Sequence, residues 1–449
     1  MASAQQPWIS DRRYGEGVGI RVGNLELHPG LAAEFGYDSN WFQRSDNEPS
    51  GTVAGGAGGR DPEAYYRLRI TPHLTLSTLS PQRREAEGMG GEPPKLNFQL
   101  GVYGAYNELF NADSDHAPED DGSEQRHVNA GAQFALDVLP NGPIGFDLYG
   151  NFVRRIEPSN SPDENFAFDR HSFRFGAGAS WRPGGGLFSW RLGYEIAYHA
   201  FLQEVFEQPF NNARHTIKSR TSWKFLPRTA LISDAEYGLV RFSNPDQTSQ
   251  NDGETLQGRI GINGLVTNHF GVLAMGGWGA TFYDDNESGF PARNYDGPVG
   301  QAELRWYITP AQTLEATSAM VGLSSVAVGY NRTFTTSYLG TFFARDRAYL
   351  NFSYFIGGVF LVAVDGGLSW IHYPDTFIDR TGTPELLEET FTEKRIEAQI
   401  FGEYRLSDAV GINTTLRYDQ NISREVGTPP VDDLDFQRFQ AYLGLRLFY

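Results

Sequence analysis

The chain has 449 residues, contains no cysteine and carries a formal net charge of −18. The absence of cysteine excludes disulfides, thiolate metal sites and cysteine nucleophiles, and the acidic balance argues against a nucleic-acid partner. No apolar run reaches the roughly 18 residues that a transmembrane helix needs.

Alternating apolar and polar residues predict strands along almost the whole chain. In "HTIKSRTSWKF", for example, Ile217, Trp223 and Phe225 lie on one side of an extended chain, and Lys218 and Arg220 lie on the other. Helical periodicity is nearly absent. The pattern predicts eighteen strands, at 29–43, 63–80, 94–112, 125–139, 143–157, 166–183, 187–204, 210–226, 228–242, 254–268, 270–284, 297–308, 311–332, 344–356, 358–373, 391–406, 408–421 and 435–449.

The connections between these strands alternate between short and long. Short ones such as "PNGP" and "LPRT" alternate with long polar ones such as "SNPDQTSQNDGE", and 81–94 is the one long exception on the short side. A soluble β-sandwich also alternates along its strands, but it does not explain this rhythm of connections. The rhythm predicts an all-β fold: a closed antiparallel transmembrane β-barrel with short periplasmic turns and long extracellular loops. Such a barrel is integral to the bacterial outer membrane, in contact with its lipid and lipopolysaccharide, and an even strand count places both termini in the periplasm.

The two ends of the chain carry separate signals. Residues 29–449 form the predicted barrel, and residues 1–28 form a periplasmic arm, a short extra strand or a segment inside the lumen. Ala2, Ser3 and Ala4 have the small-x-small form that precedes the cleavage site of a secretory leader, so we expect a removed leader and an added start Met. The final "FQAYLGLRLFY" has an apolar residue at every second place, which predicts a last wall strand pairing with "PGLAAEFGYDSNWF".

Two stretches resemble known bacterial outer-membrane proteins. The alternating apolar residues before a terminal aromatic resemble the signature that their insertion machinery reads, which implies the barrel-assembly machinery as a partner. The stretch "LELHPGLAAEFGYDSNWF" resembles the start of the β-barrel porin 2-like group, and "YITPAQTLEA" and "SYLGTFFARDRAYLNFSYFIGGVF" resemble its final third. Members of that group accompany surface polysaccharide export or gliding motility, which implies periplasmic or outer-membrane partners from such complexes. The assembly signal comprises Leu443, Leu445, Leu447 and Tyr449; the matches to the porin 2-like opening are His28, Pro29, Gly30, Tyr37, Asp38 and Asn40.

The lumen-facing side of the wall is where a pore would act. Two interpretations are open: ion pairs that neutralise one another across strands, or a field that selects anionic or sugar-like solutes. Aromatic residues near the mouth, such as Trp41, Phe42, Tyr283 and Tyr373, could stack on sugar rings. Alternation also places Glu195, Asp234, Glu236 and Glu403 inward, together with the predicted pore-lining residues Arg67, Arg69, Arg191, Lys218, Arg220, Lys224, Arg305, Glu303, Arg395, Glu397, Arg405, Arg417, Arg438 and Arg446.

One aromatic, lightly charged segment, 330–346, is unlike an outer loop. We expect it to fold inward or to pack on the rim and narrow the pore. The acidic stretch 111–124 is a solvated loop or a weak cation site.

No catalytic or metal-binding motif is present. The nine histidines show no metal-ligand spacing, GxSxG is absent, and the adjacent His171 and Ser172 point to opposite faces of a strand. We therefore expect no enzyme, no cofactor and no metal. The predicted function is passive passage or export of a polar solute or polysaccharide through an outer-membrane channel. The alternative is a structural outer-membrane anchor of a surface or gliding-motility complex, with a closed lumen.

Overall fold

The computed structural model describes residues 19–45, 62–79, 95–113, 121–123, 125–156, 169–202, 210–243, 251–284, 292–308, 324–337, 341–357, 359–374, 376–379, 384–387, 390–423 and 435–449. Most of this part is β-strand, with one short 3₁₀ helix, η2 (Pro183–Gly186), in a connection. No helix in these ranges is long and apolar enough to cross a membrane.

The strands are long and follow one another closely along the chain. Their bounds are β1 (Ile20–Val22), β2 (Leu25–Asp38), β3 (Tyr65–Thr78), β4 (Leu96–Asn111), β5 (His127–Val138), β6 (Ile144–Arg155), β7 (Arg170–Trp181), β8 (Phe188–Phe201), β9 (Asn212–Leu226), β10 (Thr229–Phe242), β11 (Gly253–Leu265), β12 (Phe270–Tyr283), β13 (Asp296–Tyr307), β14 (Ser325–Thr336), β15 (Phe342–Ile356), β16 (Phe360–Tyr373), β17 (Thr376–Asp379), β18 (Pro384–Leu387), β19 (Phe391–Ser407), β20 (Val410–Ile422) and β21 (Phe436–Phe448).

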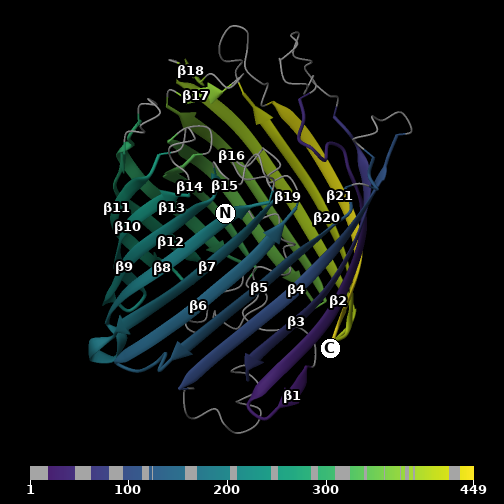
Figure 1. Ribbon diagram of the computed structural model, residues 1–449. Helices are drawn as coiled ribbons and strands as arrows, with labels where there is room; N and C mark the ends of the chain where they lie inside the picture. Colours follow the sequence, from purple (N-terminus) through teal and green to yellow (C-terminus); the bar gives the residue numbers. More distant parts are fainter. Residues whose placement is uncertain are drawn as a thin grey trace.

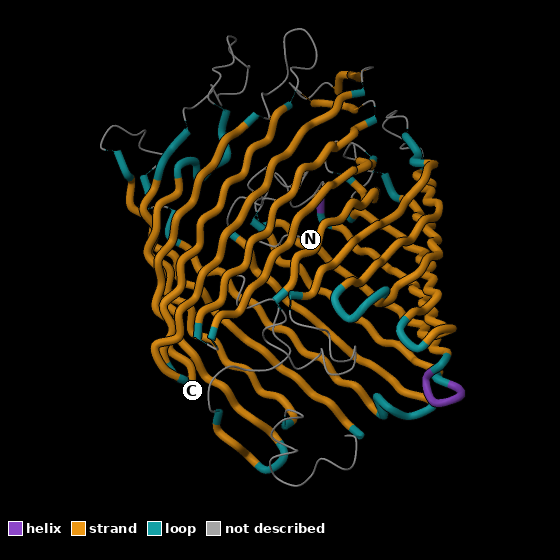
Figure 2. The backbone as a smooth tube through the Cα atoms, turned by 180° about the vertical axis from the view of Figure 1, so that it is seen from behind, coloured by secondary structure: helices purple, strands orange, loops and turns teal. Residues whose placement is uncertain are grey.

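The wall is a closed antiparallel barrel of eighteen strands, β2–β16 and β19–β21. Each wall strand pairs with the next, and β16 pairs with β19 because β17 and β18 form a separate hairpin. The last strand, β21, pairs with β2 from Gly30–Phe448 to Asp38–Gln440 and closes the ring (Figure 1). Figure 2 shows the same continuous, tilted wall from behind. The predicted fold class is confirmed, including the pairing of the last strand with the first wall strand.

The two faces of the wall differ as the alternation predicts. On β2, Phe35 is 53 % exposed and its neighbour Glu34 is 2 % exposed. On β21, Leu443 is 63 % exposed, whereas Arg446, which has the opposite parity, is 1 % exposed. Side chains on the buried face contact strands that are not their neighbours, which only the concave side of a closed sheet allows. The barrel is therefore apolar outside and polar inside. Exposed apolar surface on this scale is not found on soluble monomers, so the wall requires hydrocarbon around it.

The connections sort to the two ends of the barrel. Short connections such as 227–228 and 408–409 lie at one end, and Tyr449 lies at that end too (Figure 1). Most connections at the opposite end are longer. The exception is 337–341, which joins β14 to β15 directly.

The structure differs from the predicted boundaries at three places. Strand pairing begins before residue 29, because β1 forms a small hairpin with the start of β2. β14 continues to Thr336 and β15 begins at Phe342, so much of 330–346 is a strand hairpin. The hairpin β17–β18 was not predicted. Residues 1–18, all of 81–94, part of 111–124 and the first part of predicted strand 311–332 lie outside the described ranges.

Inside the wall, tyrosine rings lie over glycines directly opposite them on the neighbouring strand. Tyr442 covers Gly36, where an added Cβ would lie 2.1 Å from the ring, and Tyr149 covers Gly176 at 2.3 Å. Tyr103 and Tyr349 cover Gly131 and Gly329 in the same way. A flat ring thus packs against bare backbone, which joins the two strands without filling the lumen.

Candidate functional site

The closing seam of the barrel carries a buried ion pair. Arg438 on β21 donates to both oxygens of Asp38 on β2, Nε–Oδ1 at 2.9 Å and Nη2–Oδ2 at 2.5 Å. Gln440 Nε2 donates to Asp38 Oδ2 at 2.7 Å. Asp38 and Arg438 are almost fully buried. This bidentate pair fixes the register of the first and last wall strands where their side chains meet inside the lumen.

A second group of charges lies lower on the same wall. Glu403 accepts a short hydrogen bond from Arg446 and lies 3.3 Å from Arg405 Nε. One strand over, Glu34 accepts from Asn413 Nδ2 at 3.0 Å and pairs with Arg69 at 3.3 Å. The Glu34–Asn413 contact spans β21.

That contact is possible because Gly444 lies directly between the two residues; a Cβ there would lie 2.6 Å from Glu34 Cγ. The same arrangement recurs elsewhere in the lining. Arg191 reaches Asp147 across Gly178, and Arg347 reaches Glu397 across Gly367. At these three places a side-chain contact bridges over an intervening strand, and a glycine on that strand leaves room for it.

The richest cluster joins β15, β19 and β20. Glu397 pairs with Arg345 at 3.0 Å and Arg347 at 3.4 Å, and Arg395 Nε lies 3.6 Å away. Nearby, Arg417 pairs with Asp419 at 3.4 Å. Arg347 also pairs with Asp365 at 3.5 Å. This part of the wall is therefore an interleaved network of guanidinium and carboxylate groups.

The opposite side of the barrel also carries ion pairs and charged hydrogen bonds on its inner face. Glu195 accepts from Tyr149 Oη at 2.7 Å and from Lys218 Nζ at 3.0 Å. Arg191 binds Asp147 through two hydrogen bonds of 2.8 and 2.5 Å. Arg259 binds Asp234 in the same bidentate way at 2.9 and 2.8 Å.

Arg220 is different from its neighbours on this side. It is directly opposite Arg191 on β8 and Asp234 on β10, but both of those residues are engaged elsewhere. Arg220 is exposed and has no ion pair within the described ranges. It therefore presents an uncompensated positive charge to the lumen.

The predicted lining residues all lie on the polar face. Most of them are ion-paired or hydrogen-bonded, which favours the neutralising network over a free basic field. Arg220 and Lys224 are exposed. The remaining contacts are Arg67 to Asn107 Oδ1 at 2.9 and 2.6 Å, Arg305 to Glu303 at 2.9 Å, Glu303 to Tyr349 Oη at 2.8 Å, and cation–π contacts of Arg395 with Phe436 at 5.6 Å and of Arg405 with Phe448 at 5.3 Å.

Sequence reasoning missed several partners in this network, among them Arg345, Arg347, Asp147 and Arg259. Alternation within their strands places each of them on the same face as the predicted lining residues, so the signal was present. Ser172 Oγ on β7 also lies 3.0 Å from Nδ1 of His199, the residue directly opposite it on β8. A serine–histidine pair alone does not define a hydrolase, which also needs oxyanion donors and a substrate site.

The expectation that mouth aromatics are open to sugars is wrong for most of them. Trp41 is 2 % exposed, packed between Arg67, Arg438 and the ring of His127. Tyr283 and Tyr373 are also buried. Phe42 is half-buried against Tyr65. These rings are covered by protein because the segments after β2 and β14 fold back onto the inner wall.

The segment 330–346 folds inward, as predicted. Thr336 accepts from Arg214 Nη2 on β9 at 2.8 Å and from Tyr283 Oη on β12 at 3.1 Å. The Phe334 ring stacks on Tyr295 at 4.5 Å. Contact with β9, five strands from β14, places Thr336 at the end of β14 over the inner wall.

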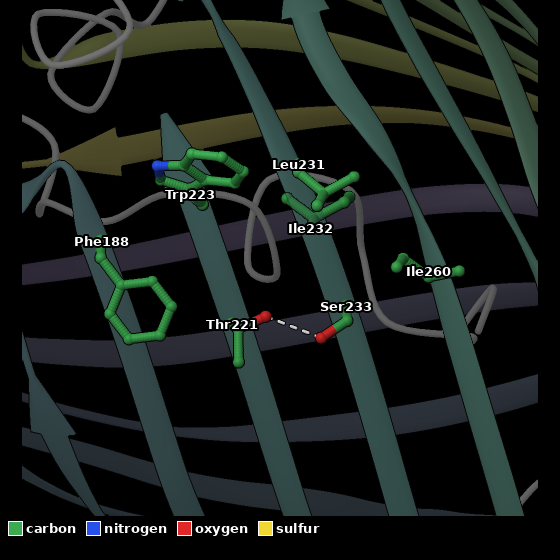
Figure 3. A pocket seen from close by; sticks show the side chains of 7 residues that line it. All are labelled: Phe188, Thr221, Trp223, Leu231, Ile232, Ser233 and Ile260. Atoms are coloured by element: carbon green, nitrogen blue, oxygen red, sulfur yellow. Dashed lines mark hydrogen bonds between the residues drawn. The ribbon is translucent and has the colours of Figure 1, made fainter. Parts of the chain in front are cut away.

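Among the residues that the structure describes, no group of three histidine, aspartate or glutamate side chains could hold a metal ion. A pocket of about 280 Å³ is lined by Phe188, Thr221, Trp223, Leu231, Ile232, Ser233 and Ile260 (Figure 3). Its two hydroxyls hydrogen-bond each other at 2.7 Å. The register places most of its lining on the outer, apolar face, so it is a depression in the hydrocarbon-facing wall.

A closed barrel with an apolar exterior and an ion-paired lining is an integral outer-membrane β-barrel of porin-like architecture. No family model matches the chain, and no curated protein matches it in sequence. Among solved structures it is similar to OpdK of Pseudomonas aeruginosa with vanillate, at a TM-score of 0.45 and 9 % identity over 94 % of this chain and 99 % of that chain.

Two further similar structures are the siderophore receptor PirA and OpdQ, both from Pseudomonas aeruginosa. PirA has a TM-score of 0.40 and 10 % identity over 94 % of this chain and 80 % of its own; OpdQ has 0.43 and 9 % over 95 % and 98 %. Such distant likeness assigns no function.

Proposed function

We propose that the protein is a passive outer-membrane channel for small polar solutes, with a preference for anions. The observation that carries this proposal is the exposed Arg220 on the inner wall, beside ion pairs that occupy its neighbours. Eighteen strands enclose a lumen wide enough for water. A cationic group in a confined, low-dielectric passage raises the local concentration of anions.

Arginine suits this role because its planar donors match carboxylate and phosphate groups. The paired arginines around Glu397 contribute further donors along the wall. A solute carboxylate could bind one of these arginines while Glu397 keeps its contact with the other. The resemblance of "LELHPGLAAEFGYDSNWF" and of two stretches in the final third to the porin 2-like group extends the proposed solutes to polysaccharide.

Orientation and partners are part of the same proposal. The end that carries the short connections and Tyr449 would face the periplasm, where the alternating Leu443, Leu445 and Leu447 would be read by the barrel-assembly machinery. The opposite end would face outward, among lipopolysaccharide. Surface or motility complexes remain proposed partners.

Planar-bilayer recording in a salt gradient tests the channel proposal. We expect the purified barrel to conduct, with a reversal potential shifted from zero toward the equilibrium potential of chloride. Arg220→Gln should move that potential toward cation preference. Arg126→Gln is the matched control, because Arg126 is exposed and pairs with Glu108 at 2.6 Å on the outer face.

A folded barrel that passes no current would contradict the proposal and favour the structural anchor with a closed lumen. A reversal potential unchanged by Arg220→Gln would refute the assigned anion preference. Liposome swelling with neutral sugars, sugar acids and anionic oligosaccharides then separates small-solute passage from polysaccharide passage.

A further inference from the structure

The seam between β13 and β14 ends before either strand does. Their register runs from Tyr307–Ser325 to Gly300–Arg332 and stops there. β13 nevertheless extends to Asp296 and β14 to Thr336. Above Gly300 the two strands therefore separate, and β14 continues with β15 as a hairpin on the inner side.

Pro298 lies at the next rung above the end of the ladder. Tyr295 accepts from Thr281 N on the β12 side, and Ile308 N donates to Ser324 O on the β14 side. Backbone groups alternate between the two sides of a strand, so the backbone of Pro298 faces β14, like that of Ile308. Proline has no N–H to offer there.

The carbonyl of Pro298 has a different partner from β14. It accepts a hydrogen bond from Tyr295 Oη at 2.7 Å. Pro298 thus has no N–H to donate to β14, and its carbonyl oxygen already accepts a hydrogen bond from the side chain of Tyr295. Extending the ladder at this rung would leave one of its two usual bonds unmade, because Pro298 has no N–H, and the other would share an acceptor already bound by Tyr295.

The end of β14 and the start of β15 pack against a site on the inner face of β12 and β13. Phe334 lies over Gly279 of β12, where an added Cβ would be 2.2 Å from its ring. Phe342 packs edge-on against Tyr295 at 5.5 Å, and Ala344 and Val299 complete a buried cluster. Side chains that strand parity would direct outward on β14 are thereby buried against the inner face of the wall.

We propose that Pro298 is a positioning residue: by ending the β13–β14 ladder it directs 333–337 and 341–345, the end of β14 and the start of β15, onto the inner side of the wall, and these two segments set the largest solute that passes. This inference rests on the proposed channel function and names the element that determines its size limit. Its two parts, position and passage, are tested by separate measurements.

Cross-linking reports the position. The chain has no cysteine, so Arg214→Cys with Thr336→Cys gives a defined pair that a short bifunctional thiol reagent can join. Phe334 still anchors the hairpin in this pair. We expect efficient cross-linking in the otherwise native barrel and loss of it when Pro298→Val is added.

Pro72→Val is the control. Pro72 also lies in a wall strand, and the β3–β4 register omits Thr71 and Pro72 but resumes at His73–Tyr103. Its neighbours stay in the wall, so this change should leave cross-linking and conductance unchanged.

Unitary conductance and size exclusion of the cysteine-containing and cysteine-free barrels report the passage. Pro298→Val should raise the unitary conductance and the size of the largest solute that passes. If Pro298→Val folds poorly, Phe334→Ala serves instead: it should raise the same two quantities without altering β13. Unchanged cross-linking in Pro298→Val, or no cross-linking in the native background, overturns the positioning role.

Lost cross-linking with native conductance overturns the size-limiting role. Absence of current in every variant refutes the channel function instead, while the cross-linking result still decides the role of Pro298.

Discussion

The closing seam provides the sharpest test of the lining. In Arg438→Gln, Asp38 loses both charge-assisted hydrogen bonds and stays almost fully buried. Breaking a buried ion pair by removing one partner costs about 3–5 kcal/mol. Two hydrogen bonds to Asp38 remain, from Gln440 Nε2 to Oδ2 at 2.7 Å and from Asn40 N to Oδ1 at 3.3 Å, but neither donor carries a charge. We therefore expect the free energy of unfolding to fall by about 3 kcal/mol, at the lower end of that range.

Equilibrium unfolding in urea of the barrel refolded into lipid measures this loss, followed by tryptophan fluorescence and by the gel mobility of the folded form. The double variant Asp38→Asn with Arg438→Gln should recover most of it, because no lone charge remains. Arg126→Gln removes an exposed pair, with 53 % of the Arg126 side chain accessible, and should change the free energy of unfolding little. Equal losses for Arg438→Gln and Arg126→Gln would refute the reasoning that burial gives the seam pair its strength.

Three other predictions concern packing, the hairpin and the exterior. Gly36→Ala should destabilise the barrel by about 1–3 kcal/mol through overpacking against Tyr442, whereas Gly104→Ala, with no atom within 4 Å, should have little effect in the same urea assay. Deleting 333–341 should raise single-channel conductance, and an unchanged value would count against a constriction there. Leu443→Lys, at a site 63 % exposed, should cost about 2–4 kcal/mol in lipid if it faces the bilayer midplane, but should be tolerated if that face touches water.

Sequence alone predicted the wall well, because strand formation and the face to which each side chain points are local properties of the chain. The strand predicted at 143–157 is Ile144–Arg155, and the side of each residue follows from its parity. Partners are another matter. Arg438 and Asp38 are 400 residues apart, and their contact exists only because the ring closes with one particular register. Parity placed both inward but could not pair them.

The hairpin shows where local reasoning becomes incomplete. The composition of 330–346 indicated an inward segment, but its route depends on an interrupted ladder at Pro298 and on a bare backbone at Gly279. Neither feature is periodic. For the same reason the burial of Trp41 and Tyr373 was not predicted, since it follows from segments that return over their own wall.

The tyrosine–glycine contacts bear on the bore of the barrel. The diameter of a closed sheet depends on strand number and on shear, the cumulative stagger between neighbours. If β21 slid by two residues along β2, Tyr442 would leave Gly36 and meet the side chain of Glu34 or Asp38. A similar slip of β6 against β7 would press Tyr149 toward Arg174 on one side. Each seated ring thus resists slippage, so rigid aromatics far from any solute help to hold the calibre of the passage constant.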